Sequence, residues 1–304
     1  MIPLSPIFKS LYRQPYLLLT LTVLFWSGNW ILGRALRLDI PPLALAFWRW
    51  VLATLILAPF AFSSLKKDWS IIKNNWRIIL FLAFSGVAVF NSLVYSGLQS
   101  TEAINAFLIQ ATMPTMIVLL SFMIFRDRLN PWQALGVLLA LIGSISIIAR
   151  GDIKVLLTLD INKGSLLIFI AVLCYALYSV FLRQRPKMKG LSFLLITFIL
   201  GVIMQLPFYL WEHLYVRQIH VDRVTVLAIL YVAIFPSILS YLFYNRGLEL
   251  AGANKGGLFF YLMPIFGSIL AFLLLDERFL WYHYLGMLLI IVGIGLNLWQ
   301  KRAS

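Results

Sequence analysis

One stretch occurs twice in this chain, first as "SGLQSTEAINAFLIQATMPTMIVLLSFMIFRDRLNPWQALGVLLALIG" at residues 96–143 and again as "RGLELAGANKGGLFFYLMPIFGSILAFLLLDERFLWYHYLGMLLIIVG" at residues 246–293. The two copies align without a gap at an offset of 150 residues. This register superposes a Met-Pro pair, several glycines and the charged turns "RDR" and "DER". An apolar composition alone would match leucines by chance but not these features, so the pattern indicates an internal duplication.

The composition places the chain in a membrane. Hydrophobic residues make up 62% of it and charged residues 12%, whereas soluble domains are about half apolar and about a quarter charged. A helix needs about 20 apolar residues to cross the hydrocarbon core. Ten runs have this length, at residues 15–33, 42–62, 78–98, 104–125, 131–149, 164–182, 191–211, 226–244, 256–275 and 280–299. The first run lacks a signal-peptide cleavage pattern, so we interpret it as an uncleaved span.

The duplication divides these runs into five and five, with repeats at residues 1–150 and 151–304. Because each repeat has an odd number of spans, the second must be inserted upside down relative to the first. Inverted repeats are typical of transporters that alternate access to a site near the membrane midplane. We therefore predict an all-α integral membrane protein of ten transmembrane helices in two inverted five-helix repeats. Transport is favoured over a duplication retained for stability alone.

The basic residues predict the orientation. Lys and Arg number 25 against 11 Asp and Glu, giving a formal charge of +14. They lie in short gaps between apolar runs, which argues against a nucleic-acid partner and for a topological signal. Sixteen lie in the gaps on the side of the N-terminus and eight in the alternate gaps. The positive-inside rule then predicts a multi-pass protein of the plasma (inner) membrane with both termini in the cytoplasm.

Four segments resemble the EamA family of the drug/metabolite transporter superfamily. They are "VLFWSGNWILGRAL", "PPLALAFWRWVLATLIL", "YSGLQSTEAINAFLIQATMP" and "LLLDERFLWYHYLGMLLIIVGIGLN". The resemblance implies two inverted five-helix halves, a central cavity lined mainly by helices 1, 3, 4, 6, 8 and 9, and cytoplasmic termini. It also implies the movement of amino acids and other small metabolites, often outward. The chain departs from the family at Asp127, where a glutamate is usual; the second repeat keeps Glu277.

Two pairs of polar residues recur in the matched spans. Asn91 and Tyr95 are four residues apart and share one helix face, and the repeat matches them to Tyr241 and Asn245. The same two residue types therefore occupy the same two positions in exchanged order. They are candidates for a substrate cavity, because a polar group in a span needs a partner. The alternative is an interhelical hydrogen bond that only holds the helices together.

Spans 1 and 6 carry further cavity candidates. Trp26 and Asn29 lie three residues apart in span 1, and Tyr175 and Tyr178 have the same spacing in span 6. Aromatic walls with a few hydrogen-bonding groups are typical of small-molecule sites. Other aromatic residues lie nearer the span ends and are predicted to form an interfacial belt: Trp30, Trp69, Trp76, Trp132, Trp281 and Tyr282.

Matched prolines predict local openings in spans 4 and 9. Pro114 has no N–H, so the carbonyl of Gln110 loses its helical partner, and Pro264 does the same for Phe260. Interrupted helices at corresponding positions commonly mark a transporter's site, so Gln110 joins the cavity candidates. Two more prolines have no proline at the matching position: Pro207 and Pro236.

Small residues line spans 5 and 10. Gly136 and Gly143, with Gly286 and Gly293, predict close helix packing. A dimer contact is the less favoured alternative, and we expect a monomer.

Arg49 is the one basic residue within a span. Counting 1.5 Å per residue from Pro42 places it about 10 Å below the outer surface, and charges at such depths mark either a site or a paired structural group. The resemblance makes an arginine expected here, within "A-F-x-R". It could meet a substrate carboxylate or brace span 2 against span 1, and we favour the structural role.

The sequence shows no metal or cofactor site and no catalytic group. Cys174 is the one cysteine, the three histidines lie near span ends, and a membrane enzyme would need a nucleophile–base pair, paired carboxylates or a metal cluster. No Asp or Glu lies within any of the ten predicted spans, which argues against proton or sodium coupling. We predict export of amino acids or related zwitterions. The alternatives are a nucleoside-containing metabolite, a nucleotide sugar, a sugar-lipid or a non-transporting sensor.

Overall fold

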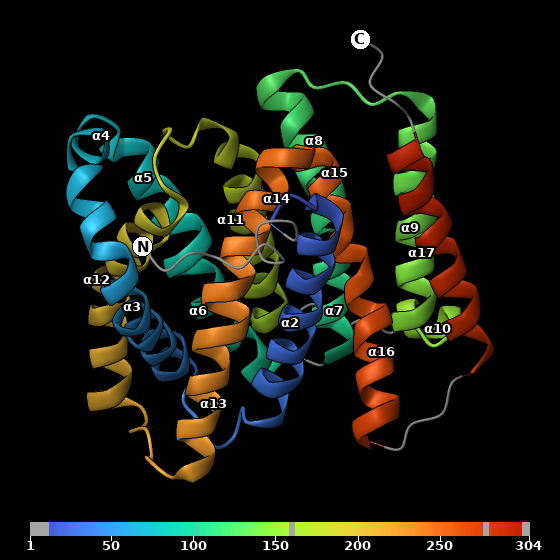
Figure 1. Ribbon diagram of the computed structural model, residues 1–304. Coiled ribbons are helices and arrows are strands. Elements are labelled where there is room, and N and C mark those ends of the chain that lie inside the picture. Colours follow the sequence, from blue (N-terminus) through green and yellow to red (C-terminus); the bar gives the residue numbers. More distant parts are fainter. Residues whose placement is uncertain (1–11, 102, 158–161, 276–279, 300–304) are drawn as a thin grey trace.

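The computed structural model describes residues 12–101, 103–157, 162–275 and 280–299, and these segments are almost entirely helical (Figure 1). In the first repeat the helices are α2 (Pro15–Ala35), α3 (Pro42–Lys67), α4 (Trp69–Asn74), α5 (Trp76–Ala83), the π-helix η1 (Phe84–Val89), α6 (Phe90–Ser100), α7 (Ala103–Ala111), α8 (Met113–Phe125) and α9 (Pro131–Ile148). The second has α10 (Ile153–Leu157), α11 (Lys163–Phe181), the 3₁₀ helix η2 (Leu182–Gln184), α12 (Gly190–Tyr215), α13 (Arg223–Ala233), the π-helix η3 (Ile234–Leu239), α14 (Ser240–Ala251), α15 (Ala253–Gly257), the 3₁₀ helix η4 (Leu258–Tyr261), α16 (Leu262–Leu275) and α17 (Trp281–Trp299).

The helices agree with the ten predicted spans. Within the described residues, nine helices are long and apolar enough to cross a membrane. The tenth expected span, residues 256–275, is divided between η4 and α16 and so contains no single helix of that length. Its described part ends at Leu275, and Glu277 of the repeated charged turn lies outside the described residues.

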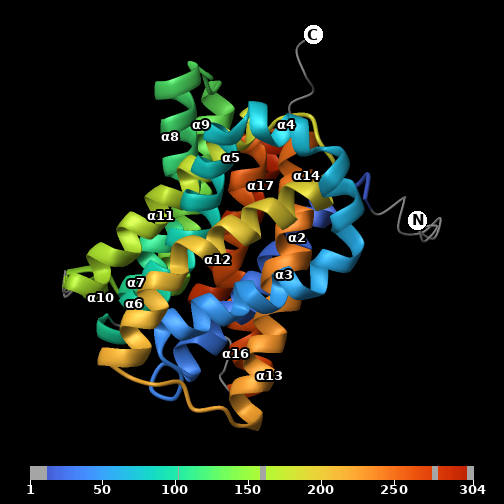
Figure 2. The same ribbon diagram turned by 90° about the vertical axis from the view of Figure 1, so that its left-hand side faces the viewer.

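The repeats pack around a pseudo-twofold relation. Spans 2 and 7 (α3 and α12) pack together on one side of the bundle, and spans 5 and 10 (α9 and α17) pack together on the other (Figures 1 and 2). Between these pairs, α2 packs against α14 and α6 against α11. These two contacts are equivalent by the repeat. Span 1 (α2) packs against the helix after the π-helix in span 8, and its counterpart span 6 (α11) packs against the helix after the π-helix in span 3.

The predicted glycine stripe lies inside this α9–α17 contact. A Cβ built on Gly136 would lie 2.5 Å from the Gly293 carbonyl oxygen, and one on Gly143 would lie 2.6 Å from that of Gly286. The backbones touch at both places, which only residues without a side chain allow. The stripe therefore joins the two repeats within one chain.

Both repeats interrupt their helices at matching places. The chain breaks between α7 and α8 at Thr112, two residues before Pro114, and the boundary between η4 and α16 falls at the equivalent Leu262, two residues before Pro264. The π-helices η1 and η3 also occupy identical positions in the two repeats. Pro236 thus has a structural counterpart after all, because Gly86 takes its place in η1.

Glu212 is more deeply buried than its predicted place at the end of a span suggests. It lies in the last turn of α12, is 4% exposed, and its carboxylate accepts hydrogen bonds from the backbone N–H groups of Leu43 (3.1 Å) and Ala44 (2.7 Å). These groups at the start of α3 have no partner within their own helix. A carboxylate at this position also interacts favourably with the helix dipole.

The aromatic belt is smaller than predicted. Trp69, Trp76, Trp132 and Trp281 are exposed on the bundle surface, but Trp30 is 3% exposed and packs on Phe107 with ring centroids 5.3 Å apart. Tyr282 is also buried. For these two residues the belt prediction was wrong, because position along a helix does not reveal which face meets lipid.

The glycine contact predicts a sharp difference between two neighbouring substitutions in α17. Gly293→Ala places a methyl group against the Gly136 backbone and should lower the free energy of unfolding by about 1–3 kcal/mol. Gly295→Ala meets nothing within 4 Å and should leave it unchanged or raise it by up to about 1 kcal/mol. Thermal unfolding of the detergent-solubilised variants measures both, and equal effects would contradict the packing described.

Candidate substrate site

A closed cavity lies where the two repeats meet. Its lining comes from α2, α3, α6, α7, α11, η4, α14 and α16. The lining residues are Trp26, Asn29, Trp30, Arg49, Phe90, Asn91, Gln110, Tyr175, Tyr241, Phe260 and Met263. The cavity volume is about 10 Å³, roughly the room that one water molecule needs. This conformation is therefore closed around a space too small for any metabolite.

Arg49 is the organising charge of this cavity, and it is 1% exposed. Its guanidinium group donates hydrogen bonds to Ser237 Oγ (2.7 Å) and Pro236 O (3.0 Å) on η3, to Asn29 Oδ1 (3.2 Å) on α2, and to Asn91 Oδ1 (2.8 Å) and Tyr95 Oη (2.9 Å) on α6. It also lies 4.8 Å from the ring centre of Trp50. One side chain therefore ties α3 to three other elements from both repeats.

Three polar atoms on the lining have no hydrogen-bond partner within the described part of the chain: Asn91 Nδ2, Gln110 Oε1 and Tyr175 Oη. All three side chains are almost fully buried, and Gln110 Nε2 makes two long contacts, each 3.7 Å, to the sulfur atoms of Met113 and Met263. Buried polar groups without partners are uncommon and point to a missing ligand or water. No cluster suited to a metal ion occurs among the described residues.

Aromatic rings form the rest of the wall. Trp26 stacks on Phe260 with centroids 5.2 Å apart and meets Tyr175 edge-on at 5.5 Å. Its Nε1 donates to the Pro236 carbonyl at 3.0 Å, so Trp26 and Arg49 share that acceptor. The carbonyl is available because the i→i−4 pairing is altered in the π-helix η3, where the Ser240 N–H donates to Phe235 O and Ser237 O and not to Pro236 O.

Four tyrosines, Tyr175, Tyr178, Tyr241 and Tyr244, form a layer over one end of the cavity, which we call the tyrosine layer. Tyr175 and Tyr241 line the cavity. On the layer's far side, Tyr178 donates to Asn245 Oδ1 at 2.6 Å, and the Tyr244 hydroxyl is 2.6 Å from that of Ser179. The Tyr241 hydroxyl donates to the Gly86 carbonyl in η1. Closure at this end thus depends on hydrogen bonds among α11, α14 and η1.

A basic vestibule begins where the tyrosine layer ends. It has a volume of about 720 Å³, and Ser179 and Asn245 are among its lining residues. Four cations and two anions also line it: Arg183, Arg185, Lys187, Lys189, Asp68 and Glu249. An open, mainly basic space is therefore separated from the closed cavity by the tyrosine layer.

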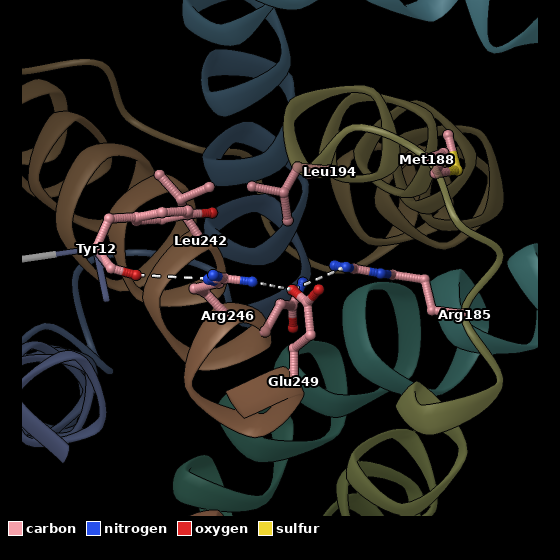
Figure 3. Close-up of a pocket in the computed structure, with 9 residues that line it drawn as sticks. Tyr12, Arg185, Met188, Leu194, Leu242, Arg246 and Glu249 are labelled. Atoms are coloured by element: carbon pink, nitrogen blue, oxygen red, sulfur yellow. Dashed lines mark hydrogen bonds and ion pairs between the residues drawn. The ribbon is translucent and has the colours of Figure 1, made fainter. Parts of the chain in front are cut away.

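A side pocket of about 210 Å³ adjoins this vestibule (Figure 3). There Glu249 lies between two arginines, 3.3 Å from Arg185 and 3.1 Å from Arg246. Burial raises the pKa of the neighbouring Tyr12 hydroxyl, against the opposing effect of Arg246. The Arg185–Glu249 pair links α14 to the α11–α12 connection at the vestibule rim, whereas the Arg246–Glu249 pair lies within α14.

A third ion pair lies at the same end of the bundle, between Arg183 and Asp127 at 2.8 Å. Partial burial opposes ionisation of Asp127, but hydrogen bonds from Ser121 and Arg183 outweigh it and hold the pKa below its usual value. The aspartate that departs from the family pattern thus remains charged and paired.

The structure gathers most of the predicted site residues and separates the others by role. Trp26, Asn29, Asn91, Gln110, Tyr175 and Tyr241 line the cavity with Arg49. Tyr95 lies behind them, where it donates to Asn29 Oδ1 at 2.6 Å, and Tyr178 and Asn245 bond to each other in the tyrosine layer. Pro114 and Pro264 do not line the cavity but follow the helix breaks beside it.

Sequence reasoning missed Trp30, Phe90, Phe260 and Met263 on the cavity wall, and Ser237 beside Arg49. The repeat held a usable signal for one of them. Phe260 matches Gln110, so this cavity candidate could have been extended from one repeat to the other. Ser237 carried no such signal, because nothing in the pattern placed η3 beside span 2.

The Tyr95 hydroxyl group should contribute strongly to stability, because it bonds to both Arg49 and Asn29. Tyr95→Phe removes a donor to Asn29 and an acceptor for Arg49, so we expect a loss of about 1–2 kcal/mol in the free energy of unfolding. Tyr231→Phe is the control, since the Tyr231 hydroxyl makes a long 3.4 Å bond to Phe25 O. Thermal unfolding of both purified variants checks this, and a larger loss for Tyr231→Phe would contradict the account.

Comparison with known proteins agrees with this architecture. The model of the EamA-like transporter family matches twice, over residues 13–149 and 162–299. "Uncharacterized transporter YyaM" of Bacillus subtilis is 30% identical over 254 residues, covering 83% of each chain. An "Uncharacterized transporter" of Archaeoglobus fulgidus is 28% identical over 287 residues, covering 93% of this chain and 97% of the relative.

A crystal structure of another protein shares the fold, with a TM-score of 0.75 and 17% identity over 93% of this chain and 96% of that one. The repeats, the packing and these matches lead to one conclusion: the chain belongs to the EamA-like transporter family.

Proposed function

We propose that this transporter exports small zwitterionic metabolites, amino acids foremost, by alternating access through the closed cavity. The observation that carries the proposal is the cavity itself, built by both repeats and lined by buried polar atoms without partners. Its closure fits an occluded state, which would have to expand to admit a substrate. Inverted repeats supply two related ways of opening such a site.

The lining suits a small molecule with polar and apolar parts. Arg49 and Asn91 offer hydrogen-bond donors, Gln110 offers an acceptor, and the surrounding rings offer an apolar surface. An amino acid has a carboxylate, an ammonium group and a side chain to match these three kinds of contact. Amino acids also agree with what the family resemblance implies, which is an argument by analogy.

Transport without ion coupling is the second part of the proposal. The described residues that line the cavity include no Asp, Glu or His, the groups on which proton- and sodium-coupled carriers usually rely. Substrate would then move down its own gradient or in exchange. With the predicted orientation, the basic vestibule faces the cytoplasm, where an exported metabolite enters.

A phosphate-bearing cargo is the second candidate, because four basic residues line the vestibule. A phosphate deep in the protein should need several cations. Arg49 is the single cation among the described cavity-lining residues, so this candidate ranks below the amino acids.

Counterflow in proteoliposomes tests the proposal. Vesicles loaded with unlabelled amino acids should accumulate labelled amino acid from outside, and imposing a pH gradient should not change the extent. Trp26→Ala or Asn91→Ala should weaken the signal about tenfold, since each removes a wall or a buried hydrogen bond. Trp132→Ala, on an exposed surface, is the matched control.

Two results would count against this account. Absence of counterflow for every amino acid would remove amino acids as the cargo. Accumulation driven by a pH gradient alone would contradict the uncoupled mechanism.

A further inference from the structure

The charge of Arg49 has no counterion among the residues that the structure describes. None of the ion pairs within the described residues includes it, and all five of its hydrogen-bond acceptors are neutral. Burying an unpaired ion is unfavourable, and hydrogen bonds to neutral groups offset only part of that cost. A ligand with a negative charge would lower the cost, so the site favours an anion on electrostatic grounds.

The guanidinium group also has one N–H group that no acceptor among the described residues occupies. Nε is paired with Ser237, and the two N–H groups of Nη1 are shared among three oxygens. Nη2 has two N–H groups but within the described residues only the Pro236 carbonyl as acceptor. One charged N–H is therefore left over on a residue that lines the cavity.

A second donor is positioned by the first. Arg49 holds Asn91 by its Oδ1 at 2.8 Å, which leaves the Asn91 Nδ2 group without a partner. Two donors on adjacent lining residues, one of them charged, are what the two oxygens of a carboxylate accept. Resting on the proposed function, we infer that the cavity is a carboxylate receptor in which the ligand's carboxylate is obligatory and an ammonium group is not.

Charge balance distinguishes the possible ligands. A bound zwitterion leaves the +1 charge of Arg49 uncompensated, whereas a monoanionic acid neutralises the site. Gln110 Oε1 and the Tyr175 hydroxyl oxygen have no partner among the described residues, and each can accept from a hydroxyl group as well as from an ammonium group. The aromatic faces can interact with an ammonium group, but no carboxylate among the described lining residues compensates it.

The chemical class that follows is an organic acid with a hydrogen-bond donor beside its carboxylate. 2-Hydroxy acids and N-acyl amino acids meet this description, and they should bind at least as well as the matching amino acids. The basic vestibule supports the same class, because four cations against two anions favour the approach of an anion.

A matched ligand series on the unmodified transporter tests the inference without any risk of misfolding. L-Leucine, 2-hydroxy-4-methylpentanoate and L-leucinamide share one side chain and differ only at the carboxylate and amino positions. Binding is read from thermal stabilisation in detergent, and counterflow inhibition is measured separately. The hydroxy acid should bind as tightly as leucine or more tightly. Leucinamide should bind at least about tenfold more weakly than leucine, since it lacks the negative charge of the carboxylate.

The two readouts separate the inference from the proposed function. Binding of both acids without counterflow would contradict transport of these compounds and leave the receptor standing. Leucinamide binding as tightly as leucine would overturn the inference, as would a hydroxy acid that binds about tenfold more weakly than leucine. Absence of binding by all three compounds would overturn it as well.

A charge exchange gives an independent test. Asn91→Asp has nearly the same shape and places a carboxylate beside Arg49, so the protein supplies its own counterion. Binding of both acids should fall at least about tenfold while leucinamide binding does not. Asn74→Asp, at an exposed position of α4, is the matched control and should change nothing. Unchanged acid binding in a folded Asn91→Asp variant would overturn the inference.

Discussion

A buried positive charge with no negative partner in the described part of the chain is the constraint around which this molecule is arranged. Arg49 is placed by α3 at the meeting point of the repeats, and neutral oxygens from α2, α6 and η3 surround it. These acceptors lie on three different elements, two of them in the first repeat and one in the second. A movement of one repeat against the other therefore has to break or replace hydrogen bonds to this one group.

The π-helices explain how the backbone takes part. η1 and η3 occupy the same position in the two repeats, and each directs a carbonyl oxygen to a side chain from another helix. Gly86 O accepts from Tyr241, and Pro236 O accepts from Trp26 and Arg49. The symmetry ends at the charge, because the position that matches Arg49 holds Ile199. Two symmetry-related π-helices thus flank a site whose charge is asymmetric.

Much of this could be predicted from the sequence, since the dominant signals are local or periodic. Apolar run length determines the spans, and an offset of 150 residues revealed the repeats, the paired helix breaks and the glycine contact. The predictions that were wrong or missing concerned the rotation of a helix about its axis and the contacts between distant segments. Trp30 was assigned to the surface although it is buried, and Ser237 was missed. The hydrophobicity of a span reveals neither which of its faces meets lipid nor which helices pack against it.

Alternating exposure of the cavity is the central claim, and thiol accessibility tests it most directly. Gln110→Cys, in a Cys174→Ser background, puts one reporter on the cavity wall, and a charged maleimide is applied from either face of oriented vesicles. The account predicts slow labelling from both faces at rest, faster labelling from each face during exchange, and a Tyr178→Phe increase confined to the vestibule side, where that hydroxyl bonds to Asn245. Labelling from one face under every condition, or equal stimulation of both faces by Tyr178→Phe, would contradict it.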